Sequence, residues 1–72
     1  MDLKKTTIVG TRAYTLSIHA ADNADVYWQP LNTRTGRPWQ AKRAIGHYEG
    51  KLANMRALQA FNRCVAVRAS AG

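Results

Sequence analysis

Residues 26–45, VYWQPLNTRTGRPWQAKRAI, predict a β-hairpin. We expect its strands at 26–31 and 39–45, because both runs carry aromatic and β-branched residues that strands favour. The run NTRTG at 32–36 separates them, and Gly36 occupies a turn position that requires a positive φ. This hairpin decides the fold, since the segments on either side of it are short and must pack against it.

The segment before the hairpin predicts one more strand. Residues 6–20, TTIVGTRAYTLSIHA, alternate between two sets of side chains and are rich in β-branched residues, which indicates a half-buried strand. Gly10 interrupts this strand and is expected at a bulge or bend. The polar run ADNAD at 21–25 predicts the turn into the hairpin, and residues 1–5 are expected to be a frayed end.

The segment after the hairpin predicts an amphipathic helix from Tyr48 or Glu49 to about Val67. At 100° per residue its apolar face consists of Ala57, Leu58, Phe61, Cys64 and Val65. The opposite, polar face consists of Arg56, Gln59 and Arg63. The run VAVRA at 65–69 is also compatible with a short strand after a break near Asn62, and residues 69–72 are expected to fray.

Short turns between these elements predict an α+β fold. It is a three-stranded antiparallel β-meander with one C-terminal amphipathic α-helix packed on one face, in a single domain of residues 1–72. We expect Trp28 or Trp39 to pack against the centre of the core. That centre is expected to consist of Leu16, Ile18, Leu58, Phe61 and Val65.

The chain is small for a protein stabilised by one core. A domain of this length buries only about 60% of its unfolded surface, which gives a stability of roughly 3–5 kcal/mol. Cys64 is the only cysteine, so an intramolecular disulfide is excluded, and His19 and His47 supply no zinc ligand set. We therefore expect no metal and no cofactor. Self-association into a homodimer, through the edge of the strand at 6–18, stays open.

The composition also bears on the compartment. No apolar run approaches the roughly 20 residues of a membrane span, and the N-terminus, MDLKKTTIVG, has no apolar signal segment. A lone free thiol fits a reducing environment. The expected localisation is cytoplasmic, with no membrane partner.

The ionisable residues do not suggest an enzyme. Asp22 and Asp25 are expected in a mobile turn, which does not hold two carboxylates in a desolvated site. Glu49 is expected in the first turn of the helix, where it complements the dipole. Cys64 is expected on the apolar face of the helix, as a small buried hydrophobe. We therefore expect no catalytic residues.

The strongest functional signal is the charge. Eleven Lys and Arg face four Asp and Glu, which gives a net charge of +7, and seven of the eleven are Arg. Guanidinium forks match phosphates and carboxylates with paired hydrogen bonds. The expected partner is therefore the phosphate backbone of a nucleic acid or an acidic protein surface of a host complex. The candidate binding residues are Arg34, Arg37, Gln40, Lys42, Arg43, Arg56 and Arg63.

Two functions compete for these residues. In architecture alone, the predicted sheet with a C-terminal helix resembles the arm-binding domains of tyrosine recombinases and the plant ethylene-response DNA-binding domain. It is also similar to a double-stranded-RNA-binding domain that lacks its first helix. The resemblance to the two DNA-binding domains implies that the sheet reads the major groove. From the residues themselves we expect nucleic-acid binding, with DNA favoured over RNA, by the basic hairpin at 26–45, since a two-stranded ribbon can enter the major groove. The alternative is a small inhibitor or adaptor of the phage or mobile-element type, similar to anti-CRISPR proteins, that covers a host protein complex.

Overall fold

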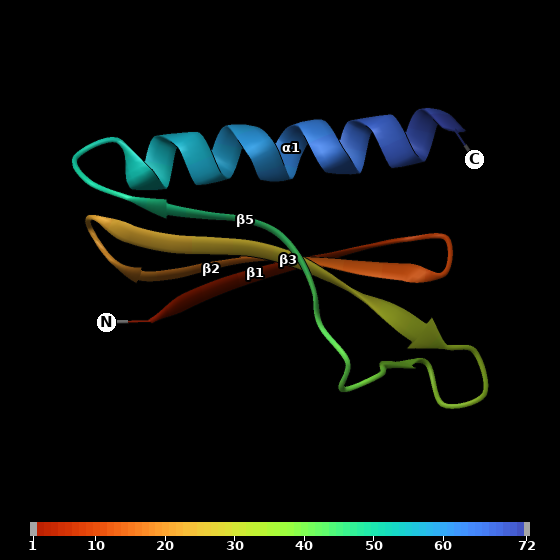
Figure 1. The fold of residues 1–72 in the computed structure, drawn as a ribbon. Helices are drawn as coiled ribbons and strands as arrows, with labels where there is room; N and C mark the ends of the chain where they lie inside the picture. Colours follow the sequence, from red (N-terminus) through yellow and green to blue (C-terminus); the bar gives the residue numbers. More distant parts are fainter. Residues whose placement is uncertain (1, 72) are drawn as a thin grey trace.

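The computed structural model describes residues 2–71 and consists of an antiparallel β-sheet covered on one face by a C-terminal helix (Figure 1). The sheet order is β1-β2-β3, and β4 and β5 both pair with β3. The α+β class predicted from the sequence is therefore confirmed, but the sheet has five strands where three were expected. The elements are β1 (Leu3–Val9), β2 (Arg12–Ala20), β3 (Asn23–Asn32), β4 (Arg37–Pro38), β5 (Arg43–Glu49) and α1 (Ala53–Ala71).

The single strand expected at 6–20 is a hairpin of two strands. Val9 pairs with Arg12, which leaves Gly10 and Thr11 as a two-residue loop, and Gly10 has a φ of 61°. A positive φ at the first loop position is the backbone geometry of a type II′ turn, which matches the twist of the flanking strands. The glycine expected at a bend therefore reverses the chain. Three residues of the expected frayed end, 3–5, belong to β1 as a result.

The last strand is shifted along the sequence from its expected position. Residues 39–42 lie in a loop, and β5 continues past Gly46 to Glu49, a residue expected in the helix. Val26 pairs with Gly46 and Tyr27 pairs with Ala44, so Ile45 forms a bulge. A Cβ atom on Gly46 would lie 2.7 Å from the Tyr48 hydroxyl oxygen, because the Tyr48 ring lies across this position. Gly46 therefore leaves room for the Tyr48 ring to pack over β5, and the strand does not end at this glycine.

Helix α1 is continuous over 19 residues, without the break considered near Asn62, and it includes 69–71 of the expected frayed tail. It packs on the sheet through Ala53, Ala57 and Phe61, which are fully or almost fully buried. The two alanines allow the helix backbone to approach the sheet closely. Within residues 2–71 the protein has no helix long and apolar enough to cross a bilayer.

The core lies between α1 and the central strands. Its buried residues are Tyr14, Leu16, Ala24, Val26, Ala57 and Phe61. The predictions for Leu16 and Phe61 are confirmed, and Ile18, Val65 and Trp28 are half-buried at its margin. The prediction for Leu58 is wrong, because its side chain is 42% exposed. The buried stripe of α1 is narrow, and Leu58 lies about 100° around the helix from Ala57.

The face of the sheet opposite α1 carries no helix, as Figure 1 shows. Even so, Thr15 and Ser17 on this face are only 3% and 2% exposed. Both belong to β2, which has a paired strand on each side, and the Thr15 hydroxyl is hydrogen-bonded to that of Thr6 at 3.1 Å. Small side chains thus line the open face where longer neighbours surround them, which leaves a hollow there.

Candidate nucleic-acid interface

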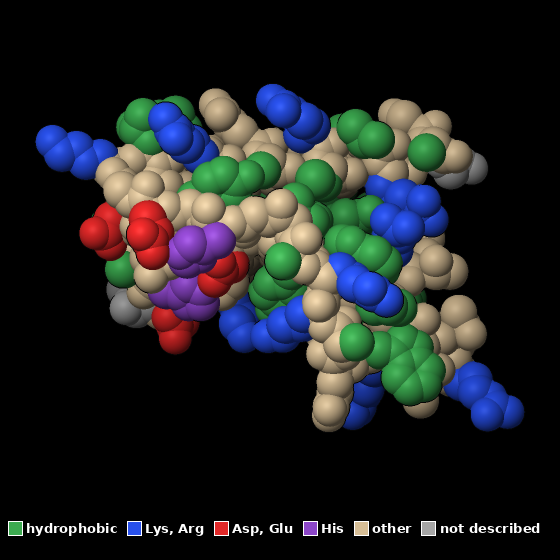
Figure 2. Space-filling view, viewed as in Figure 1, with side chains coloured by type: hydrophobic (Ala, Val, Ile, Leu, Met, Phe, Trp, Pro, Cys, Tyr) green, Lys and Arg blue, Asp and Glu red, His purple; other side chains and the backbone are tan. Residues whose placement is uncertain are grey.

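The acidic residues gather at one end of the protein. Asp22 lies in the β2–β3 turn, Asp25 near the start of β3, Glu49 at the end of β5, and Asp2 just before β1. The strand register brings these positions to the same end of the sheet, since Asn23 pairs with Glu49 and Leu3 with Ile18. Figure 2 shows the carboxylates and both histidines grouped there, away from most of the cations. We call this region the acidic end.

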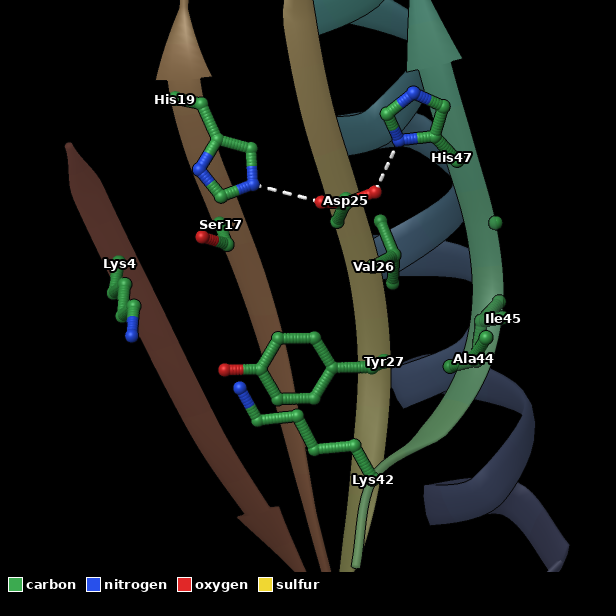
Figure 3. A pocket seen from close by; sticks show the side chains of 11 residues that line it. Lys4, Ser17, His19, Asp25, Val26, Tyr27, Lys42, Ala44, Ile45 and His47 are labelled. Carbon is green, nitrogen blue, oxygen red and sulfur yellow. Dashed lines mark hydrogen bonds and ion pairs between the residues drawn. The ribbon is translucent and has the colours of Figure 1, made fainter. Parts of the chain in front are cut away.

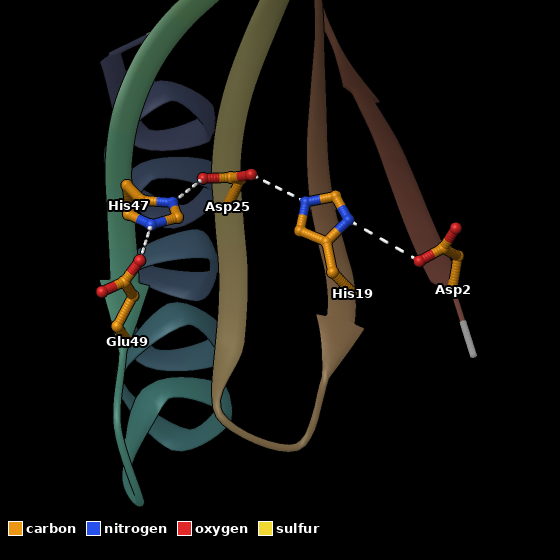
Figure 4. A network of polar contacts seen from close by, with 5 residues as sticks. All are labelled: Asp2, His19, Asp25, His47 and Glu49. Atoms are coloured by element: carbon orange, nitrogen blue, oxygen red, sulfur yellow. Dashed lines mark hydrogen bonds and ion pairs between the residues drawn. The ribbon is translucent and has the colours of Figure 1, made fainter.

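The two histidines form hydrogen bonds or ion pairs with three of the four carboxylates, as Figures 3 and 4 show in part. Asp25 lies between His19 and His47 and is hydrogen-bonded to both, with His19 Nε2 at 2.7 Å from its Oδ2. His47 Nε2 lies 3.0 Å from Glu49 Oε1, and His19 Nδ1 lies 3.7 Å from Asp2 Oδ1. Asp25 is therefore a member of an ordered network on β3 and not, as expected, a residue of a mobile turn.

The network shifts two protonation equilibria. Hydrogen bonds to Glu49 and Asp25 raise the pKa of His47, because both ring nitrogens face carboxylates and the imidazolium can donate to each. The hydrogen bond from His47 in turn lowers the pKa of Asp25, with a smaller contribution from His19. Within residues 2–71, the partners of Asp2, Asp25 and Glu49 are therefore imidazoles and not lysines or arginines.

Within residues 2–71 the lysines and arginines consequently have no carboxylate partner. Every ion pair within residues 2–71 joins a carboxylate to His19 or His47, and none involves Lys or Arg. Buried or paired arginines often have a structural role, whereas unpaired ones on a surface are free to bind an external anion. The unpaired state of these cations is the main electrostatic property of the protein.

Six of the seven arginines lie at the end of the protein opposite the acids. Arg12 starts β2 directly after the Gly10 hairpin, and Arg43, which starts β5, pairs with Trp28. The β3–β4 turn and the second half of α1 each supply two more. We call this region the arginine end, and it consists of Arg12, Arg34, Arg37, Arg43, Arg63 and Arg68.

A hollow of about 390 Å³ lies within the arginine end, between α1 and the sheet. Arg12, Arg63 and Arg68 line it, together with Trp28 and Cys64. The Arg12 guanidinium lies over the Trp28 ring, 4.1 Å from its centre. A guanidinium stacked in this way is held in place by its flat face, and its N–H groups stay available at the edge. Arg12 is therefore oriented to bind an anion before any partner arrives.

The β3–β4 turn presents its arginines on an ordered backbone. The Arg34 amide donates to Asn32 Oδ1 at 3.0 Å, and the Gly36 amide donates to the Asn32 carbonyl at 2.8 Å. Gly36 has a φ of 73°, which confirms the expected positive value. The side chains of Arg34 and Arg37 are exposed on this turn. The basic tip predicted from the sequence is thus a hydrogen-bonded turn.

Four of the seven predicted site residues belong to the arginine end, and three do not. Those at the arginine end are Arg34, Arg37, Arg43 and Arg63, whereas Gln40 lies exposed in the loop at 39–42. That loop is held by Gln29, which donates to the Trp39 carbonyl at 2.7 Å. Lys42 lies on the open face of the sheet, 4.7 Å from the centre of the Tyr27 ring. Arg56 is in the first half of α1, near the acidic end.

Sequence reasoning left out two arginines that the fold adds to this site. Arg12 joins it only because Gly10 reverses the chain, and Arg68 only because α1 continues past Val67. Of the two tryptophans expected as alternatives against the core, only Trp28 packs there, because Trp39 is 54% exposed. Trp28 also forms the surface on which Arg12 stacks.

The site offers donors for anions and no centre for a cation. Residues 2–71 contain no group of three or more His, Cys, Asp or Glu arranged to hold a metal ion, even within the histidine–carboxylate network. Cys64 is a free thiol, half-buried beside the hollow. The chain matches no family model, no curated protein and no solved structure.

Proposed function

We propose that this protein is a small, non-catalytic nucleic-acid-binding module, with DNA favoured over RNA, that contacts phosphates through its arginine end. One observation carries the proposal: six of the seven arginines lie away from the acidic end, three of them around one hollow, and none has a carboxylate partner within residues 2–71. Arginine forks bind phosphate oxygens through paired, charge-assisted hydrogen bonds. A cluster of them is the electrostatic footprint expected of a nucleic-acid-binding surface.

The separation of charge favours one orientation on a polyanion. The acidic end is repelled by phosphates, whereas the arginine end is attracted, so the field of the whole protein turns the arginine end toward the partner. Arg12 loses little conformational freedom on binding, because it is already stacked on Trp28. These two properties support a binding role for the surface beyond a merely soluble basic face.

The β3–β4 turn suits entry into a groove. The major groove of B-DNA is about 12 Å wide and admits a two-stranded ribbon. Arg34 and Arg37 would meet phosphates or guanine edges from the tip of such a ribbon, and Gln40 in the adjoining loop has the amide that pairs with adenine. The function would be accessory or regulatory, since the chain contributes binding and no chemistry.

A direct test is to measure the affinity of a labelled duplex DNA, the matching duplex RNA and a single strand by fluorescence anisotropy. Arg34→Ala/Arg37→Ala and Arg63→Ala/Arg68→Ala should each weaken duplex binding at least about tenfold, because each removes two phosphate contacts. The matched control is Lys51→Ala/Arg56→Ala, which makes the same change in net charge near the acidic end. Equal effects of all three variants would show that net charge alone causes the binding, and would contradict the proposal.

A second candidate function, a protein-directed inhibitor or adaptor, is favoured by the outer side of the start of α1. Leu52, Met55 and Leu58 are 49%, 53% and 42% exposed there, beside Arg56. Apolar side chains grouped with arginine are typical of protein interfaces. A pull-down with and without nuclease separates the two functions. A stoichiometric protein partner that survives nuclease treatment and is lost in Met55→Ser/Leu58→Ser would favour this second function.

A further inference from the structure

The open face of the sheet contains a second hollow, distinct from the arginine end. It has a volume of about 360 Å³, within the range of about 300–1,000 Å³ that small-molecule sites occupy. Its floor includes Ser17, which is only 2% exposed although no helix covers this face. Its walls are Lys4 from β1, Lys42 from the loop before β5, and Tyr27 from β3 (Figure 3).

One side of this hollow is rich in hydrogen-bond donors. Figure 3 shows the Tyr27 ring and the Lys42 side chain extending over β2, and the Lys4 side chain lying along β1 at the other edge of the hollow. Neither ammonium forms an ion pair with a carboxylate within residues 2–71. In the same part of the chain, no hydrogen bond involves the side-chain hydroxyls of Ser17 or Tyr27. Two positive charges and two hydroxyls without a hydrogen-bond partner in residues 2–71 therefore line one hollow.

The other side of the hollow presents an acceptor. Asp25 pairs with Ser17, which pairs with Lys4, so the backbones of Asp25 and Lys4 lie two strand spacings apart across the sheet, about 10 Å. Each Asp25 oxygen is bonded to one histidine, but a carboxylate has about four lone-pair positions and can accept further hydrogen bonds. The histidines also fix the orientation of this carboxylate before a ligand binds.

We propose that the hollow is a binding site for a small organic phosphate, with the phosphate between Lys4 and Lys42 and an O–H or N–H donor of the ligand on Asp25. A phosphate monoester carries about −1.5 to −2 charges and three strong acceptor oxygens, which matches two ammoniums and two hydroxyls. A hollow of about 360 Å³ between backbones about 10 Å apart is of a size that fits a sugar phosphate or a mononucleotide. The site lies outside the arginine end, and of its residues only Lys42 was among the nucleic-acid-binding residues predicted from the sequence.

The test is a titration followed by two-dimensional ¹H–¹⁵N NMR, with inorganic phosphate, ribose 5-phosphate and ribose as probes. Ribose 5-phosphate should shift the amide signals of Ser17, Tyr27 and Ala44 and bind at least about threefold more tightly than inorganic phosphate. Ribose alone should cause no shift. Equal affinity for ribose 5-phosphate and inorganic phosphate would contradict the hydrogen bond from the ligand to Asp25. Amide shifts confined to residues outside the hollow would contradict the location of the site.

Variants separate this site from attraction by net charge. Lys4→Ala/Lys42→Ala should lower the affinity for ribose 5-phosphate at least about tenfold, because the double substitution removes both charge-assisted contacts. Lys51→Ala/Arg56→Ala, with the same change in charge outside the hollow, should change the affinity less than about twofold. Arg63→Ala/Arg68→Ala should leave it unchanged while nucleic-acid binding falls. Equal loss in all three variants would refute the proposal.

Discussion

The salt dependence of DNA binding tests the arginine end quantitatively. If its six arginines each neutralise one phosphate, the slope of log K against log salt should be about −5.4, since each contact contributes about −0.9. Arg63→Ala/Arg68→Ala removes two of the six and should reduce the slope to about −3.6. Doubling the salt concentration should then weaken wild-type binding about 40-fold and the variant about 12-fold.

The assay is fluorescence anisotropy with a 20-base-pair duplex at four or more salt concentrations between about 0.1 and 0.3 M. Circular dichroism should accompany it, because Arg68 lies in the last turn of α1 and also complements the helix dipole. Lys51→Ala/Arg56→Ala should keep the wild-type slope within about 0.5. A wild-type slope near zero would refute nucleic-acid binding through phosphates, and an equal loss of slope in the control would refute the assignment to the arginine end.

Three further predictions concern stability and assembly. Phe61→Ala should lower the free energy of unfolding by about 3–5 kcal/mol, which is close to the whole stability of so small a domain. Leu58→Ala should lower it by less than about 1 kcal/mol, because this side chain is exposed. Urea titrations of both variants check this, and the opposite order would contradict the assignment of the helix face. Because the pKa of His47 is raised above its ordinary 6.5, its contribution to stability is present below pH 6.5 and is lost as the pH rises through the raised value; the Tm should fall over that range in the wild type and not in His47→Gln. The lowered pKa of Asp25 adds stability above pH 3.8 that is lost as the pH falls below it, which Asp25→Asn should abolish. A homodimer should pair through β1, which has one free edge and no proline. Thr6→Pro should therefore convert such a dimer to an 8.0 kDa monomer in sedimentation, whereas a dimer that persists would exclude this edge.

The sequence predicts the elements that carry a strong local signal. The turn at 32–36 and the existence of a C-terminal helix follow from turn chemistry and periodicity, and both agree with the structure. The Gly10 reversal was hidden, because the residues on both sides of it favour strands and a two-residue loop resembles a bulge in a single strand. The strand expected at 39–45 lies at Arg43–Glu49 for a related reason. Gly46, which was expected to end the strand, lies within it because the Tyr48 ring packs over this position.

The candidate sites depend on long-range pairing that local patterns do not contain. Arg12 and Trp28 are sixteen positions apart and meet because β2 and β3 are paired next to each other. The histidine–carboxylate network joins three strands, and each of its members, taken singly, looks like an ordinary turn or surface residue. The hollow on the open face needs β1, which exists only because of the Gly10 loop. The charge of the sequence predicted an anionic partner, but only the register of the sheet separates the acidic end from the arginine end.

This separation has a physical consequence for the free protein. Six guanidiniums without a carboxylate partner within residues 2–71 repel one another, and this repulsion destabilises the compact state. Added salt screens it and should stabilise the free protein, although the same salt weakens the complex with DNA. A polyanion that binds only the folded state removes the repulsion more completely and adds stability by mass action, about 2.7 kcal/mol at one hundred times its Kd. Opposite effects of salt on the Tm of the free protein and on its DNA affinity would therefore be expected from one cause, the unpaired charge of the arginine end.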